Sequence, residues 1–251
     1  MSVDTPEQLE GLRRVGRVVA ETIAAVRRAA LPGVTTGELD ALAEVEFERH
    51  GARSGPILTY GYPGSICLSI DDEIVHGVPG TRRLREGELL TIDVAAELDG
   101  FHADAATTIA VGEPPPEADR LLASGRRALA AGIQAARPGA MLRDVGAAVE
   151  DAVEADGFRV ARELTGHGIG RRMHEPPTVF NWPAPFDEAL QRLTEGLVFT
   201  IEPMITAGKP EFAAAADGWT IRSLDGARST HEEHTVMVRH GGALVLTEPV
   251  G

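Results

Sequence analysis

Apolar and polar positions along the chain predict two similar series of helices and strands. Ala-rich, Arg-bearing stretches predict amphipathic helices at residues 9–30 and 117–136. A Pro-Gly pair interrupts each stretch, and a second helix is expected within residues 31–52 and 137–158. Apolar runs typical of strands follow each helix pair. The chain is therefore expected to belong to the α+β class.

The two series are related by a shift of 106 positions. The shift matches identical residues in both second-helix regions: Pro32/Pro138, Gly33/Gly139, Ala41/Ala147, Glu44/Glu150, Glu48/Glu154 and Gly51/Gly157. Chance similarity between amphipathic helices is the alternative to a duplication. A duplication predicts two helix pairs backing a shared sheet region, with a cleft where the halves meet.

No low-complexity linker separates the two halves. We therefore expect residues 1–251 to form a single domain, with pseudo-repeat halves of about 9–112 and 117–240. The run "GEPPPEAD", residues 112–119, is the expected crossover between them.

Residues 88–112, "ELLTIDVAAELDGFHADAATTIAVG", predict a hairpin that carries two acids on one face. Asp99-Gly100 is a strong signal for a two-residue turn, which places Leu98 opposite Phe101, Ala95 opposite Asp104 and Asp93 opposite Ala106. Side chains alternate between faces, so Asp93 and Asp104 become diagonal neighbours. Two ionised carboxylates this close repel each other on a half-buried strand unless a cation lies between them.

Two further apolar runs each carry an acid. "GLVFTIEPM", residues 196–204, places Glu202 at the end of its apolar part, just before Pro203, which is expected to stop the strand. "HEEHTVMV", residues 231–238, places Glu233 on the face of Thr235 and Met237. Each is expected to form a strand. An edge acid paired with arginine is the alternative for either glutamate.

The run "LTGHGIGRRMHEPP", residues 164–177, surrounds His167 with glycines and is expected to be a loop that approaches a ligand closely. His76 and His174 also lie beside Gly or Pro turns. The glycine spacing fits no phosphate-binding fingerprint, and no H-E-x-x-H or G-x-S-x-G motif is present. Cys67 lacks the context of a nucleophile, which disfavours covalent catalysis.

Net charge and cysteine content exclude several classes of function. A formal net charge of −14 argues against a nucleic-acid partner. No apolar run is long enough for a bilayer, and the N-terminus lacks the pattern of a signal peptide. One cysteine cannot form an intramolecular disulfide, so a reducing, cytoplasmic location is expected.

The charge of the four acids indicates the number of ions. Asp93, Asp104, Glu202 and Glu233 carry four negative charges when ionised, which two divalent cations neutralise. Carboxylates with one imidazole suit Co, Mn, Fe, Zn or Mg better than a thiolate-selecting metal. A pair of such ions can hold a hydroxide nucleophile at neutral pH, which is the chemistry of a hydrolase.

These motifs resemble those of the type I methionine aminopeptidases, which have the pita-bread fold with two pseudo-twofold-related halves. The resemblance covers almost the whole chain and rests on "IDV", "GFHAD", "GHGIG", "FTIEP" and "EEHT". Only 35 residues separate His167 from Glu202, which leaves no room for the insertion of type II enzymes.

The resemblance implies a role for each motif residue. Asp93 would chelate one metal ion, Asp104 and Glu233 would bridge the pair, and His167 and Glu202 would complete the second site. Glu202 would also carry the proton from water to the departing amine. The remaining roles fall to His76, which would contact the substrate nitrogen, and His174, which would polarise the scissile carbonyl.

The resemblance also implies a pocket for the first side chain of the substrate, built by Tyr62, Cys67, Met173 and Trp219. Some residues near the cleft depart from the family pattern. Ala103 stands where glycine is common, and Tyr60 stands where many members have histidine. Such changes affect rate and selectivity in the pocket rather than the metal ligands.

The function implied is removal of the initiator methionine from nascent proteins by a monomeric enzyme, with the ribosome as a possible partner. A broader or X-Pro aminopeptidase of the same fold is one alternative. A non-catalytic binding protein is another, although such relatives typically lose ligands that this chain retains.

Overall fold

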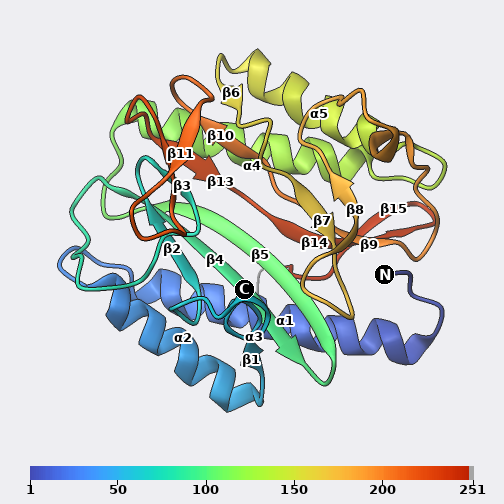
Figure 1. Cartoon of the computed structure of the whole chain (residues 1–251), viewed down its shortest axis with the longest axis horizontal. Coiled ribbons are helices and arrows are strands. Elements are labelled where there is room, and N and C mark those ends of the chain that lie inside the picture. Colours follow the sequence, from blue (N-terminus) through green and yellow to red (C-terminus); the bar gives the residue numbers. More distant parts are fainter. Residues whose placement is uncertain (249–251) are drawn as a thin grey trace.

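The computed structural model describes residues 1–248, and its four longest helices lie in two pairs on opposite sides of the strands (Figure 1). One pair comes from each half of the chain. The helices are α1 (Pro6–Ala29), α2 (Thr36–His50), α3 (Gly55–Tyr60), α4 (Pro116–Ala135), α5 (Leu142–Ala155) and the 3₁₀ turn η1 (Asp187–Leu190). Within the described residues, every helix is too short or too polar to pass through a lipid bilayer.

The strands pair in antiparallel sheets between the helix pairs, as expected for the α+β class. One sheet has the order β1 (Arg53–Ser54), β4 (Leu89–Leu98), β2 (Cys67–Ile70), with β5 (Phe101–Ala110) also on β4. A second has the order β15 (Gly242–Val245), β14 (His234–Arg239), β9 (Val198–Ile201), β7 (Gly166–Gly168), β8 (Glu175–Val179). Two smaller sheets are β13 (Ser229–His231), β10 (Met204–Thr206), β6 (Arg159–Val160) and β11 (Phe212–Ala214), β12 (Ile221–Ser223), β3 (Glu73–Val75).

Local signals explain where the helices begin and end. The Thr35 hydroxyl accepts a hydrogen bond from the Glu38 amide at 3.1 Å, and the Glu38 carboxylate accepts one from the Thr35 amide at 2.7 Å. This reciprocal cap satisfies amide groups that lack a partner within the first turn of α2. Gly51 ends the helix at φ 68°, in the left-handed region that glycine adopts at little cost.

The hairpin β4–β5 has the register predicted from its turn. Asp99 and Gly100 adopt φ values of 51° and 77° and connect the two strands. The predicted pairs are present: Leu98 with Phe101, Ala95 with Asp104 and Asp93 with Ala106. Both faces of β4 are largely buried, because α1 packs on one face and the cavity described below lies against the other.

One backbone hydrogen bond recurs in the two halves, with donors 106 positions apart (139 − 33) and acceptors 109 positions apart (193 − 84). The Gly33 amide donates to Leu84 O at 2.8 Å, and the Gly139 amide donates to Leu193 O at 2.8 Å. Both glycines have positive φ, 91° and 88°, which the tight approach after the first helix requires. In each half, the turn between the paired helices is therefore bonded to the segment that precedes a central strand, β4 in the first half and β9 in the second.

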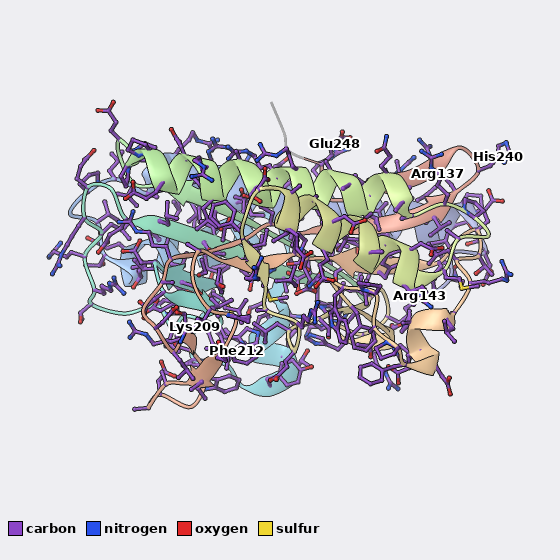
Figure 2. All side chains as sticks on the ribbon, turned by 90° about the horizontal axis from the view of Figure 1, so that it is seen from above. Arg137, Arg143, Lys209, Phe212, His240 and Glu248 are labelled. Carbon is purple, nitrogen blue, oxygen red and sulfur yellow. The ribbon has the colours of Figure 1, made fainter. Side chains whose placement is uncertain are left out.

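Two apolar clusters, built largely from Val, Leu, Ile and Ala, support the two helix pairs. One includes Leu12, Leu39 and Ile92, and the other includes Leu121, Val149 and Phe199. Figure 2 shows α4 and α5 side by side above the strands, the arrangement that buries the second cluster. The strands that carry or flank the acids are thus held from both sides.

The run 196–204 forms β9, which ends at Ile201 directly before Glu202, and Pro203 interrupts the ladder as predicted, because it cannot donate a ladder hydrogen bond. Two other expectations about strands need correction. The run 231–238 is also divided, since Glu232 and Glu233 lie between β13 and β14. His167 lies on the short strand β7 rather than in a loop.

Candidate metal centre and substrate cavity

All eleven residues that the sequence singled out line one cavity of about 340 Å³. They come from both halves of the chain and from segments separated by up to 171 positions. The residues are Tyr62, Cys67, His76, Asp93, Asp104, His167, Met173, His174, Glu202, Trp219 and Glu233. The cavity therefore lies where the two halves meet.

Hydrogen bonds fix Asp104 and Glu233 next to each other. The Thr235 hydroxyl accepts a bond from the Asp104 amide at 2.9 Å and donates to Asp104 O at 2.8 Å. The Glu233 amide donates to Ala106 O at 2.8 Å. Glu233 thus belongs to no strand, yet its backbone is held against β5 two residues from Asp104.

Glu202 and His167 share a connection through Thr200. The Thr200 hydroxyl donates to Glu202 Oε1 at 2.6 Å and accepts from the His167 amide at 2.9 Å. His167 Nε2 lies 3.6 Å from Glu202 Oε1. The side-chain amide of Asn181 also donates to Glu202 O at 3.0 Å. This bond holds the segment that connects β9 to β10.

Burial makes ionisation of the four acids unfavourable. Burial and the Glu202 carboxylate raise the pKa of Asp93 to about 7, and burial with the Asp104 carboxylate raises the pKa of Glu202 to about 8. The pKa values of Asp104 and Glu233 lie well above their usual range for the same reasons, burial first. Acids this close need protons or cations between them.

The histidines of the cavity are held neutral. Burial lowers the pKa of His167 to about 3, with a contribution from His174, and it lowers the pKa of His76 and His174. The ring centroids of His167 and His174 are 3.9 Å apart. The backbone of His76 has φ 58°, an unusual conformation for a residue other than glycine. The side chain of His76 lines the cavity. Neutral imidazoles can ligate metals and exchange hydrogen bonds.

The apolar part of the cavity contains the four predicted pocket residues. The Tyr62 and Trp219 rings meet edge to face with centroids 5.2 Å apart, and the Tyr62 hydroxyl donates to Gly77 O at 2.7 Å. Cys67 and Met173 are buried. Burial raises the pKa of the Cys67 thiol, which agrees with its expected role in packing rather than nucleophilic attack.

His231 also lines the cavity, although it was not among the residues expected there from the sequence. Its Nε2 lies 3.7 Å from Glu202 Oε2 and 3.7 Å from Glu233 Oε2. Burial lowers its pKa to about 3. A signal was available in the sequence, because His231 precedes Glu233 by two positions in a strand-like run and residues so spaced share a face.

The side chains present fit divalent cations. Asp104 Oδ1 and Glu233 Oε1 are buried and find no hydrogen-bond partner within residues 1–248. Donor atoms of Asp104, His167 and Glu233 lie within 4.8 Å of one another, and so do those of Glu202, His231 and Glu233. Carboxylate and imidazole donors at this spacing suit divalent first-row metals.

Converging acids and neutral histidines beside an apolar pocket define a metal-dependent hydrolase. The chain belongs to metallopeptidase family M24, which matches residues 10–240, and it has the pita-bread fold of that family. The resemblance inferred from the motifs is thereby confirmed at the level of the family.

Named relatives resemble the chain over nearly its full length. It is 39% identical to methionine aminopeptidase of Escherichia coli K12 over 250 residues, covering 98% of this chain and 94% of that protein. The structure of methionine aminopeptidase from Thermotoga maritima superposes with a TM-score of 0.94 at 33% identity, covering 99% and 100% of the two chains. Prolidase from Pyrococcus furiosus has a TM-score of 0.78 at 20% identity and is covered over 66% of its length, which shows the shared fold alone.

Proposed function

We propose that this chain removes N-terminal methionine from peptides and newly made proteins with the help of two divalent metal ions. The observation that carries the proposal is the single cavity in which four acids and His167 lie beside the apolar residues Tyr62 and Trp219. The similar proteins from Escherichia coli and Thermotoga maritima bear the name methionine aminopeptidase, which supports methionine as the first residue.

Asp93, Asp104, His167, Glu202 and Glu233 would hold the ions. Two divalent ions match the four negative charges of the carboxylates, whereas one would leave the buried cluster with a charge of −2. When bound, such ions supply Lewis acidity and lower the pKa of water. Their identity among Co, Mn, Fe, Zn and Mg depends on metal availability as well as on these ligands.

Each remaining polar side chain would act on the substrate. Glu202 lines the cavity and would move a proton from the attacking water to the departing amine. The His174 ring, whose Nδ1 bonds Tyr60, would donate through Nε2 to the scissile carbonyl oxygen. His76 would contact the nitrogen of the substrate, and the methionine side chain would pack among Tyr62, Cys67, Met173 and Trp219.

We also infer that both halves act as one catalytic domain. Asp93 and Asp104 come from the first half of the chain, whereas His167, Glu202 and Glu233 come from the second. Neither half contains a full set of donors. The single cysteine supports a reducing compartment, so newly made cytoplasmic proteins would be the cellular substrates.

Peptide specificity tests the proposal. Purified protein loaded with Mn²⁺ or Co²⁺ is expected to hydrolyse a Met-Ala peptide much faster than Leu-Ala and Ala-Pro peptides, and a chelator should abolish the activity. Asp104→Ala is expected to be inactive. Equal turnover of the three peptides would contradict methionine specificity, and preferential turnover of Ala-Pro would favour an X-Pro peptidase instead.

A further inference from the structure

His231 is a buried imidazole without a partner at the metal centre. Its side chain is 3% exposed, and neither ring nitrogen has a hydrogen-bond partner anywhere in residues 1–248. A buried polar group normally finds a partner, because leaving it unpaired costs free energy. The position of His231 therefore needs an explanation that the five expected ligands do not provide.

The distances around His231 are those expected between donors of a common ion. Nε2 is 3.7 Å from one oxygen of Glu202 and 3.7 Å from one oxygen of Glu233, which is too long for a hydrogen bond to either. Two donors that each bind a metal at about 2.1 Å can be separated by up to about 4 Å. The three donor atoms thus surround a point that a small cation can reach.

Glu202 lies between two imidazoles that approach its different oxygens. His167 Nε2 is 3.6 Å from Oε1, and His231 Nε2 is 3.7 Å from Oε2. The Thr200 hydroxyl donates its hydrogen bond to Oε1 rather than to Oε2. The oxygen that faces His231 is therefore available to share an ion with it.

We propose that His231 is an additional protein ligand, through Nε2, of a metal ion that Glu202 and Glu233 hold. The proposal rests on the proposed function, because it assumes that the carboxylate cluster binds divalent ions. With His231, the centre has two imidazole and four carboxylate ligands. Nitrogen donors favour Co²⁺ and Zn²⁺ over Mn²⁺ and Mg²⁺.

Metal affinity is the first readout. Isothermal titration of the metal-free protein is expected to show that His231→Gln weakens Co²⁺ binding by about 10–100-fold, by analogy with the effect of losing a supporting group at a metal site. Mn²⁺ binding should weaken less. His240→Gln is the matched control, since His240 is exposed at one end of the molecule (Figure 2), and it should leave both affinities unchanged.

Proton NMR of the Co²⁺-loaded protein counts the bound imidazoles directly. A Co²⁺-bound histidine gives a strongly shifted, exchangeable N–H resonance, so the unmodified protein is expected to show two, from His167 and His231. His231→Gln should retain one, and His240→Gln should retain both. Because the count is made on the unmodified chain, it does not depend on how well a variant folds.

The outcomes separate this proposal from the proposed function. One shifted resonance in fully loaded, active protein, with unchanged Co²⁺ affinity in His231→Gln, would overturn the role of His231 alone. Failure to bind divalent ions or to hydrolyse Met-Ala peptides would overturn the proposed function as well. Two resonances and weakened binding in the variant support both.

Discussion

The Tyr60 hydroxyl lies 2.7 Å from Nδ1 of His174, and their rings are 5.5 Å apart. If the hydroxyl donates to Nδ1, the proton of the neutral imidazole resides on Nε2, where it can be donated to a substrate oxygen. Tyr60 is thus placed to set the tautomer of His174. The sequence had indicated only that Tyr60 departs from the family pattern.

Loss of this hydroxyl is therefore expected to slow turnover. Tyr60→Phe should lower kcat by about 5–10-fold, the equivalent of about 1–1.5 kcal/mol for one hydrogen bond, and leave KM nearly unchanged. Tyr60→His should restore part of the rate, because an imidazole can also donate. Steady-state kinetics with a Met-Ala peptide measure both, and the exposed neighbour variant Leu58→Ala serves as control. An unchanged kcat in Tyr60→Phe would refute this role.

The pocket residues predict a different kinetic signature. Trp219→Ala removes the edge-to-face partner of Tyr62 and the wall against which the methionine side chain would pack. Because this contact is remote from the reacting bond, KM should rise about tenfold, with a smaller change in kcat. Trp182→Ala is the matched control, since Trp182 packs on Phe180 and Phe186 instead. Equal effects of the two substitutions would argue against the pocket.

The raised pKa values of the acids predict a pH dependence of stability in metal-free protein. The unfolded chain is fully ionised at pH 7, whereas folded Asp93 and Glu202, with pKa values of about 7 and 8, still bind protons. The folded state thus binds more protons, so the free energy of unfolding falls as pH rises from 7 to 8, by roughly 1–3 kcal/mol. His167 and His231 add only a small term of opposite sign, because they are neutral in the folded state and only about a quarter protonated in the unfolded chain at pH 7.

Urea unfolding at several pH values, with chelator or with saturating Mn²⁺, measures this dependence. The ions should remove most of the pH dependence, since they take the place of the protons on the cavity acids and release them on binding. Glu232→Gln is a suitable control: Glu232 is buried and has a pKa raised to about 7, yet its carboxylate faces Thr107 rather than the cavity. In metal-free Glu232→Gln, the free energy of unfolding should still fall with pH nearly as steeply as in the unmodified protein. A flat profile in metal-free wild type would refute the electrostatic account.

Local signals in the sequence were sufficient for parts of the fold. Asp99-Gly100 determined the register of β4 and β5, because a two-residue turn fixes which residues face each other. That register placed Asp93 and Asp104 on one face. The Pro-Gly pairs and the glycines after the second helices located the helix pairs to within a few residues, since these residues act on the adjacent backbone.

Features that depend on distant contacts were predicted less well. The backbone of Glu233, between β13 and β14, bonds Ala106 on β5 instead of continuing a strand. His167 lies on a strand because β7 pairs with β8 and β9. His231 was missed because the significance of a lone histidine depends on what surrounds it in space. Its neighbours Glu202 and Glu233 became visible only when the two halves were brought together.

The number of divalent ions bound per chain tests the central claim most directly. Equilibrium dialysis of metal-free protein against Mn²⁺ or Co²⁺, followed by metal analysis, is predicted to give about two ions per chain, with four buried acids neutralised between them. Glu233→Gln should bind fewer. Binding no higher than that of an unrelated acidic protein, or two ions retained by Glu233→Gln at unchanged affinity, would contradict the account.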